Sequence, residues 1–293
     1  MSTKEAISYQ KWLKQASEAF IEISETPTLD ARVLLCHCIQ KPLSYVLAWP
    51  ERTIQDEIIS HLDNLKQRRI TGEPLAYIVG KREFWSMNFE VTPAVLIPRP
   101  ETELLVEWAI DKIINANHDA KTVNGVLELG TGSGAIAVAI GKEYPELQLY
   151  ATDISEAALE LARKNATTNS CKSITFLKGS WFDAIGSEKF ELIVSNPPYV
   201  ATGDPHLQEG DLPYEPIGAL VAKENGLSDI QYLISEAKNY LYSNGWLGLE
   251  HGFDQGDKVR QMMSEHGYQN IQTIQDLAGI DRLSVCQWEE HHE

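Results

Sequence analysis

The chain has 293 residues, of which 43% are hydrophobic and 23% are charged, and its formal net charge at pH 7 is −17. The composition is that of a globular protein, and the apolar runs are too short to span a membrane. The charge argues against a protein that grips nucleic acid over a broad face, because such proteins set cations against phosphates.

The acidic excess is confined to one part of the chain. Residues 1–85 contain 11 Lys and Arg against 11 Asp and Glu, whereas the remainder contains 14 against 31. Basic residues cluster in one region: Lys66, Arg68, Arg69, Lys81 and Arg82. We interpret this cluster as a solvated helix face. The first residues lack the apolar segment of a signal peptide, so we expect a cytoplasmic protein.

The four cysteines do not form a metal-binding pattern. Cys36 and Cys38 flank His37, but this is not the spacing of a Cys-x-x-Cys knuckle. No second pair follows, since Cys171 and Cys286 stand alone. We therefore expect buried thiols in a reducing compartment and no metal site.

The first part of the chain has a helical pattern, and we predict a small helical bundle over residues 1–82. The segment TIQDEIISHLDNLKQRRI places five apolar residues on one stripe of a helix: Ile54, Ile58, Ile59, Leu62 and Leu65. The period then changes, because EFWSMNFEV alternates apolar and polar residues and AVLIP follows a Thr-Pro turn. This change predicts a β-hairpin linker over 83–97.

Strands and helices alternate from residue 98 to residue 293. Short apolar runs predict seven strands, near 126–129, 147–152, 173–177, 191–195, 246–250, 270–274 and 282–288. Segments such as SGAIAVAIGKEY and SEAALELARKNA fill the gaps with helices. The alternation is typical of βαβ units, so we predict an α/β domain with a Rossmann-like, mostly parallel sheet of seven strands.

The first strand of this domain runs into a glycine loop and then a helix, in the segment VLELGTGSGAIAVAI. Gly130, Gly132 and Gly134 let a ligand approach the backbone closely, and the helix that follows offers unpaired N–H groups. The spacing up to Ala135 also fits the dinucleotide fingerprint G-x-G-x-x-G/A. Asp153, at the end of the second strand, suits a ribose diol with either cofactor. A tight turn without a ligand is the alternative.

Two features favour S-adenosylmethionine (AdoMet) over NAD. Glu128 lies just before the loop, where a carboxylate would repel a pyrophosphate but attract the ammonium or sulfonium group of AdoMet. The segment NPPY, residues 196–199, follows the fourth strand and so reaches the edge of the sheet where ligands bind in open α/β folds.

The segment NPPY joins an amide to two rigid rings. Asn196 and Pro197 each precede a proline, which holds both out of helical geometry. Two acceptors then lie side by side, the Asn196 side-chain oxygen and the Pro197 carbonyl, and they suit the two donors of a planar NH₂ group. With both N–H bonds held, one face of the nitrogen points at a methyl donor. Such positioning is worth roughly 7–11 kcal/mol.

This pattern predicts methylation of a planar NH₂ group, for which adenine N6, cytosine N4 and a glutamine amide all qualify. The net charge of −17 argues against DNA or structured RNA as the substrate. A proline-rich turn with a capping Asn is the alternative that involves no chemistry.

Several segments together resemble the HemK/PrmC family of peptide chain release factor glutamine N5-methyltransferases. They are TGEPLAYIVGKREFWSMNFEVTPAVLIPRPETE, ELGTGSGAIA, GSWFD, IVSNPPYV and LEHGFDQG. The resemblance covers nearly the whole chain and implies a class I AdoMet-dependent methyltransferase fold. It also implies methyl transfer from AdoMet to the glutamine of the Gly-Gly-Gln motif in class 1 release factors.

The resemblance further implies which residues form the site. The loop Gly130, Thr131, Gly132, Ser133 and Gly134 would wrap the methionine part of AdoMet, Asp153 would hold the ribose and Trp181 would pack on the adenine. Asn196 would contact both AdoMet and the substrate amide, with Pro197, Pro198 and Tyr199 completing the glutamine pocket. Ser180 departs from the acidic residue that the family pattern has before the tryptophan.

The N-terminal helical domain would help to recognise the release factor, and we expect a monomer that binds neither nucleic acid nor a membrane. The alternatives that stay open are a glutamine methyltransferase of a ribosomal protein, a nucleic-acid adenine N6-methyltransferase and a non-catalytic AdoMet-binding partner of translation factors.

Four charged or titratable residues near these motifs receive a structural interpretation. We interpret Arg99, Glu101 and Glu103 as residues that cap and charge a helix N-terminus, and His251 as a structural histidine. The alternatives are that the first three line the site and that His251 reaches the pocket. Glu250, at the end of the fifth strand, is within reach of the site. The loop 201–225 is long and rich in Gly and Pro, which is typical of a lid.

Overall fold

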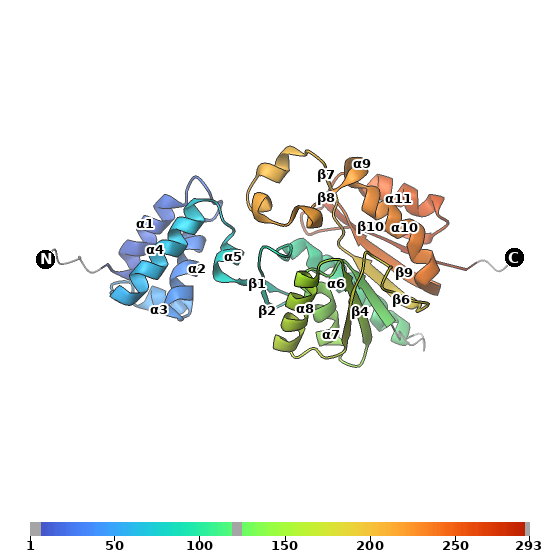
Figure 1. Ribbon diagram of the computed structural model, residues 1–293, viewed down its shortest axis with the longest axis horizontal. Helices are drawn as coiled ribbons and strands as arrows, with labels where there is room; N and C mark the ends of the chain where they lie inside the picture. Colours follow the sequence, from blue (N-terminus) through green and yellow to red (C-terminus); the bar gives the residue numbers. More distant parts are fainter. Residues whose placement is uncertain (1–6, 119–124, 291–293) are drawn as a thin grey trace. The chain divides into compact units, whose positions relative to one another are not determined.

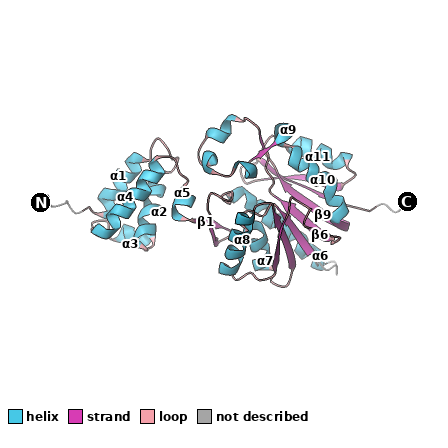
Figure 2. Cartoon of the chain, viewed as in Figure 1, coloured by secondary structure: helices cyan, strands magenta, loops and turns pink. Residues whose placement is uncertain are grey.

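The computed structural model describes residues 7–118 and 125–290. They fall into two compact units, each with its own core. The first unit comprises the chain up to Gly80 together with Pro205–Tyr214, and the second comprises Lys81–Asp204 and the chain from Glu215 onward. Figure 1 traces the chain through both units, and Figure 2 shows that the first is built of helices and the second around a sheet.

The described part of the first unit contains five α-helices: α1 (Tyr9–Ala19), α2 (Pro27–Ile39), α3 (Leu43–Ala48), α4 (Asp56–Ile70) and α5 (Leu75–Val79). The apolar stripe predicted along the fourth helix faces the core, where Leu62 and Leu65 are buried together with the preceding Ile54. Trp12 and Phe20 from α1 fill the same core. This part of the chain is therefore helical in the structure, as the pattern of its sequence predicts.

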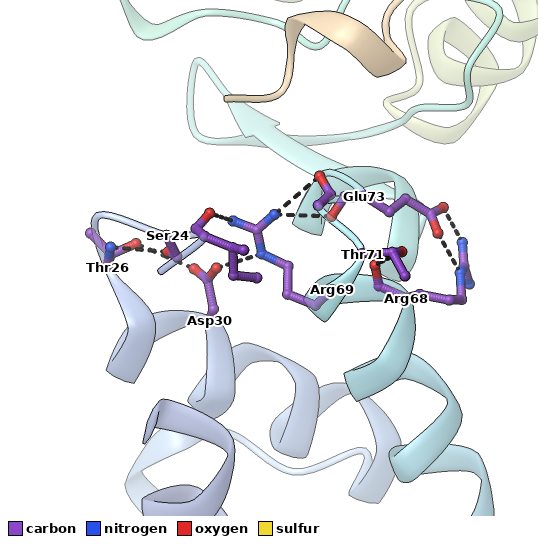
Figure 3. A network of polar contacts seen from close by, with 9 residues as sticks. Ser24, Thr26, Asp30, Arg68, Arg69, Thr71 and Glu73 are labelled. Atoms are coloured by element: carbon purple, nitrogen blue, oxygen red, sulfur yellow. Dashed lines mark hydrogen bonds and ion pairs between the residues drawn. The ribbon is translucent and has the colours of Figure 1, made fainter. Parts of the chain in front are cut away.

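A buried ion pair joins α2 to α4 inside this unit (Figure 3). Asp30 and Arg69 are both almost fully buried, and Arg69 Nε lies 2.8 Å from Asp30 Oδ2. The guanidinium also donates to the carbonyls of Glu73, at 3.0 Å, and Ile23, at 3.3 Å. The neighbouring Arg68 pairs with the Glu73 carboxylate. Interpreting this basic cluster as a solvated helix face is thus wrong for Arg69, because a buried carboxylate draws its side chain inward.

The segment Pro205–Tyr214 belongs to the first unit although it comes from the middle of the second. Tyr214 donates its hydroxyl proton to the carbonyl of Thr71, just beyond the end of α4. The tyrosine ring lies against Gly72, whose φ of +95° and lack of a side chain leave room for it. The loop 201–225 therefore contributes to both units.

A hairpin opens the second unit. Strands β1 (Lys81–Phe84) and β2 (Met87–Glu90) pair antiparallel around Trp85 and Ser86, which both have positive φ as in the two-residue turns that match strand twist. The hairpin covers 81–90 and not 83–97, because the turn falls in the middle of the alternating segment. Residues 91–97 form turns and irregular structure, so the predicted extension of the hairpin to residue 97 is wrong.

All seven predicted strands of the α/β domain are confirmed. They are β3 (Gly125–Leu129), β4 (Gln148–Asp153), β5 (Ile174–Lys178), β6 (Phe190–Ser195), β9 (Leu241–Glu250), β10 (Gln269–Gln275) and β11 (Asp281–Gln287). The sheet has the order β10-β11-β9-β6-β3-β4-β5. Five neighbouring strands are parallel, and β11 and β10 complete the sheet in antiparallel fashion.

Helices cover both faces of this sheet and bury its alternating side chains. Val126 of β3 packs with α6 (Glu103–His118), α7 (Ala135–Glu143) and α8 (Glu156–Thr168). Leu127 and Leu129 face the other way, toward α10 (Ser228–Tyr240) and α11 (Gly256–Glu265). This three-layer arrangement is the α/β architecture that the sequence predicts. Among the described residues, the structure has no helix with the length and apolarity of a membrane span.

The Asp30–Arg69 pair gives a stability prediction. Arg69→Met leaves the Asp30 carboxylate buried without its cation, so we expect the first unit to lose ~3–5 kcal/mol of unfolding free energy. Arg68→Met is the matched control, because its ion pair is partly exposed and worth about 1 kcal/mol or less. Hydrogen exchange of α2 and α4 peptides in urea measures both losses. Equal losses in the two variants would contradict the role given to the buried pair.

Candidate active site

The site lies where the order of the sheet reverses. The chain moves from β3 to β4 on one side and later returns to β6 on the other side of β3. Leu129 and Ser195 pair at the carboxyl ends of β3 and β6, and Ser195 Oγ donates to the Leu129 carbonyl at 2.7 Å. The next residues, Gly130 and Asn196, are thereby brought to the same edge, at the switch point where open α/β sheets bind ligands.

The glycine loop after β3 is held against β4 and α8. Gly130, Gly132 and Gly134 have φ values of +72°, +54° and +83°. The N–H groups of Gly130 and Thr131 both donate to the Thr152 carbonyl at 2.9 Å. A Cβ atom on Gly134 would lie 3.1 Å from that of Ala162 in α8, so a side chain at this position would push the loop away from the helix.

Glu128 holds the glycine loop against α7 through two hydrogen bonds. Its Oε2 accepts from the Thr131 hydroxyl at 2.6 Å and from the Ala137 N–H at 3.0 Å. Burial, assisted by the nearby Asp153 carboxylate and opposed by these two hydrogen bonds, raises the pKa of Glu128 to about 8. The residue also lines the cavity described below, where a bound cation would favour its ionised form.

Asp153 stands at the end of β4 and fixes the opposite side of the loop. Its Oδ2 accepts from the Gly132 N–H and its Oδ1 from the Ser155 N–H, both at 2.8 Å. Each carboxylate oxygen has a second lone pair, so Asp153 can still accept hydroxyl protons from a ribose in the cavity.

Trp181 forms an aromatic wall beside the loop. A Cβ atom on Gly130 would lie 3.3 Å from the indole ring, so the ring packs directly on this glycine. The backbone carbonyl of Trp181 accepts from the Thr152 hydroxyl at 3.1 Å. Ile154, 70% exposed, lines the same cavity. The indole and this apolar side chain form walls suited to a flat base.

These elements enclose a cavity of about 410 Å³ in the second unit. Most predicted cofactor residues line it: Gly130, Thr131, Gly132, Ser133, Asp153, Trp181 and Asn196. Gly134 does not, because it packs on α8. Of the predicted substrate residues, Asn196 and Pro198 line the cavity and Pro197 and Tyr199 lie outside its lining.

Asn196 is oriented by a residue that sequence reasoning missed. Its Nδ2 donates to the Thr102 hydroxyl oxygen at 3.0 Å, so Oδ1 is the atom left for the cavity. Thr102 is buried and comes from the 3₁₀ turn Pro100–Thr102 that precedes α6. The Tyr199 hydroxyl meets Glu250 Oε1 at 3.4 Å behind this pair, and burial raises the pKa of the tyrosine well above its ordinary value.

Asp229 is a second residue that sequence reasoning missed. It lies in the first turn of α10 and lines the cavity, and burial raises the pKa of its carboxyl. Nothing in the sequence sets Asp229 or Thr102 apart, since both reach the site only through tertiary packing. Together with Glu128 and Asp153, Asp229 gives the cavity three carboxyl groups that can balance the charge of a cationic ligand.

Arg99 lines the cavity, so its interpretation as a residue that only charges a helix is wrong. Its guanidinium pairs with the buried Glu215, which holds it at the cavity wall. Glu215 Oε2 also accepts from the Ile97 N–H at 3.0 Å. The part of the loop after Glu215 is thereby fixed, and Pro216 and Gly218 complete the lining.

His251, by contrast, has a structural role. It is fully buried, with Nδ1 2.9 Å from the Gly252 carbonyl and Nε2 2.9 Å from the Ser284 hydroxyl. Burial lowers its pKa. Glu103 likewise serves the fold, because its carboxylate accepts from the Trp85 N–H at 2.7 Å and so anchors the hairpin to α6.

Comparison with known proteins agrees with this architecture. The family model described as the PrmC N-terminal domain matches residues 11–80, and the model described as the methyltransferase small domain matches residues 110–209. The release factor glutamine methyltransferase of Aliivibrio fischeri is 47% identical over 97% of this chain and 98% of its own length. The chain belongs to the release factor glutamine methyltransferase family. The Vibrio cholerae member is also 47% identical, over 98% of this chain and 99% of its own.

Solved structures support the fold of this family member. The hMettl16 catalytic domain, in complex with the MAT2A 3′UTR hairpin 1, has a TM-score of 0.55 and is 14% identical over 83% of this chain and 85% of its own. At this identity the likeness concerns the fold alone. It confirms the class I methyltransferase architecture, with the mostly parallel sheet of seven strands described above.

The cavity fits AdoMet, the methyl donor of this class. Its volume of about 410 Å³ lies within the range of small-ligand pockets. Trp181 and Ile154 offer apolar walls for a base, and Asp153 offers acceptors for a ribose. Glu128 and Asp229 add carboxyl groups suited to a ligand with two cationic centres.

The raised pKa of Glu128 predicts a pH-dependent stability. Between its ordinary value of 4.5 and about 8, the folded protein holds a proton that the unfolded chain releases, so stability falls as pH rises. Glu128→Gln keeps an acceptor for both hydrogen bonds but does not titrate. We expect the melting temperature of this variant, relative to wild type, to be higher at about pH 8 than at about pH 5.

Differential scanning calorimetry of both proteins across this range measures the effect. Glu107→Gln, on the exposed side of α6, is the matched control for loss of a carboxylate. A Glu128→Gln difference that does not change with pH would contradict the assigned titration.

Proposed function

We propose that this enzyme transfers the methyl group of AdoMet to the side-chain amide nitrogen of the glutamine in the Gly-Gly-Gln motif of class 1 release factors. The names of its relatives and their near-complete coverage support this substrate. The observation that carries the proposal is the Asn196 amide, whose nitrogen is held by Thr102 at 3.0 Å beside the glycine loop.

The protein's own residues would act mainly by positioning. Asn196 Oδ1 and the Pro197 carbonyl accept the two N–H bonds of the glutamine amide and hold its nitrogen in one plane. AdoMet, when bound, supplies an electrophilic methyl group on a sulfonium centre. The two acceptors also stabilise the positive charge that grows on the nitrogen. The methylated nitrogen is acidic and releases its proton readily, so no strong base is required.

Cofactor binding would fall to the residues on the other side of the cavity. Residues 130–133 follow the methionine part, Asp153 accepts from the ribose hydroxyls, and Trp181 packs on the adenine. The cavity position of each residue supports this assignment. Gly134 contributes indirectly, because its close packing on α8 keeps the loop in place.

The proposal also covers the role of the first unit, the location of the protein and its oligomeric state. The first unit would help to recognise the release factor, and its match to the PrmC N-terminal domain supports that role. We further propose a cytoplasmic monomer that does not bind nucleic acid. The internal pairing of Arg68 and Arg69 supports the last point, because it removes two cations from the basic cluster.

Methyl transfer from labelled AdoMet tests the proposal. We expect label in a recombinant class 1 release factor and none after the Gly-Gly-Gln glutamine is replaced by alanine. Label in a ribosomal protein would support the closest alternative, and label in RNA or DNA would overturn the substrate. Absence of transfer to any of these, with AdoMet still bound, would favour the non-catalytic alternative.

Asn196→Ala tests the residue that carries the proposal. We expect kcat to fall on the order of 10²–10³-fold while the AdoMet dissociation constant changes little, because the lost acceptor serves the transition state. Asn115→Ala, at an exposed position on α6, is the matched control. Parallel losses of turnover and AdoMet affinity would mean that Asn196 serves only to bind the cofactor.

A further inference from the structure

The side chain of Gln255 joins the two ends of the long loop 201–225. Its Nε2 donates to the carbonyl of Tyr199 at 3.0 Å, where the chain enters the loop, and to the carbonyl of Asn225 at 3.3 Å, where the chain leaves it. Its Oε1 accepts from the Gly252 N–H at 2.8 Å. Two acceptors meet the NH₂ end of the amide and one donor meets its oxygen, so the orientation of this buried side chain is fixed.

Gln255 belongs to the segment LEHGFDQG, residues 249–256, and none of these described residues lines the cavity. It directly precedes α11, at a position where polar side chains often cap a helix. Within the described part of the chain, however, its side chain makes no capping hydrogen bond with α11. The amide is instead directed at the backbone that follows NPPY, so its partners there, and not the helix, account for its burial.

The turn that receives this amide has a strained backbone. Glu224 and Asn225 have φ values of +54° and +57°, and Gly226 follows with +83°. Left-handed geometry is uncommon for residues with a side chain and persists where the surrounding structure enforces it. A Cβ atom on Gly226 would lie 2.1 Å from the Tyr199 carbonyl oxygen and 2.8 Å from Gln255 Nε2. The turn therefore packs directly on the end of NPPY, where a side chain does not fit.

Strand pairing closes the loop next to this contact. β7 (Val200–Ala201) and β8 (Val221–Ala222) are parallel and begin directly after NPPY and directly before the strained turn (Figure 1). The Val200 N–H donates to the carbonyl of Leu220 at 2.9 Å. The two ends of the loop are thus held together by backbone pairing and by the Gln255 amide.

NPPY itself has few backbone donors with which to hold its position, because its two prolines carry no N–H. At its start, the Asn196 side chain donates to the Thr102 hydroxyl at 3.0 Å. At its end, the Tyr199 carbonyl accepts from Gln255. The Pro197 carbonyl lies between these two anchors, so its position depends on both.

We propose that Gln255 is a positioning residue for methyl transfer, which holds the Tyr199 carbonyl so that the Pro197 carbonyl stays aligned with the substrate amide. This inference rests on the proposed function of NPPY as the binding site of the glutamine amide. Because Gln255 lies outside the cavity lining, it acts through the backbone of NPPY.

Gln255→Met tests this role, because it removes both donors at nearly constant length. We expect kcat, with release factor and AdoMet saturating, to fall on the order of 10–10²-fold, because a small displacement of an aligned group slows the reaction. The dissociation constant of the demethylated cofactor, measured by titration calorimetry, should stay within about twofold of wild type. Gln261→Met, at an exposed position on α11, is the matched control.

Gly226→Ala displaces the same carbonyl from the other side. Its Cβ atom would force the Tyr199 carbonyl away from Gln255, so we expect a similar fall in kcat with little change in cofactor affinity. Gly203→Ala is the matched control, because Gly203 has nearly the same φ, +81°, and no described atom lies within 4 Å of its Cβ position. Combined with Gln255→Met, Gly226→Ala should cost less than the product of the two separate losses, since both act on one contact. Losses that multiply would overturn the shared contact.

The outcomes distinguish this inference from the proposed function. A wild-type enzyme that does not methylate release factors overturns both. An active wild type whose Gln255→Met variant turns over as fast as the Gln261→Met control overturns the inference alone, as does a loss of cofactor affinity that matches the loss of turnover. Should one of the Gln255 and Gly226 variants fail to fold, as judged by its melting temperature, the other and its control decide. If neither folds, the contact serves the fold and the inference is overturned.

Discussion

The parallel pairing of β3 with β6 is the constraint on which the rest of this structure depends. Because Leu129 and Ser195 are paired at the ends of these strands, the chain leaves the sheet twice at the same place. One exit becomes the glycine loop and the other becomes NPPY. In the proposed reaction, a methyl donor at the glycine loop and an amide at NPPY must approach within contact distance, and this pairing brings the two segments together.

Buried carboxyl groups then hold the remaining segments around the cavity. Glu128 ties the glycine loop to α7, Glu215 ties the loop after β7 (Val200–Ala201) to residues 97–99, and Glu250 underlies NPPY. All three are nearly inaccessible to solvent. The raised pKa values of Glu128 and Glu250, about 8 and about 7, reflect the cost of keeping a carboxyl group out of water. Burial of these carboxyl groups lowers the stability of the fold, and their hydrogen bonds hold the cavity walls in place.

The sheet and the glycine loop could be predicted from the sequence, because apolar periodicity and glycine spacing are patterns of residues close together in the chain. The hairpin was predicted too long, since the alternating pattern does not reveal a turn in its own middle. Thr102 and Asn196 are separated by 94 residues, and no local signal reports that they touch. The sequence around Arg69 indicates a surface cation, because its partner Asp30 lies far away in the chain.

In the proposed reaction, Asn196 Oδ1 and the Pro197 carbonyl together bind the glutamine amide. A crystal structure of the enzyme with the demethylated cofactor and a release factor tests it most directly. The account predicts that the glutamine nitrogen lies about 2.7–3.2 Å from both oxygens, with the Asn196 nitrogen still on Thr102. A glutamine nitrogen held by other groups, or an Asn196 amide that turns its nitrogen toward the substrate, would contradict it.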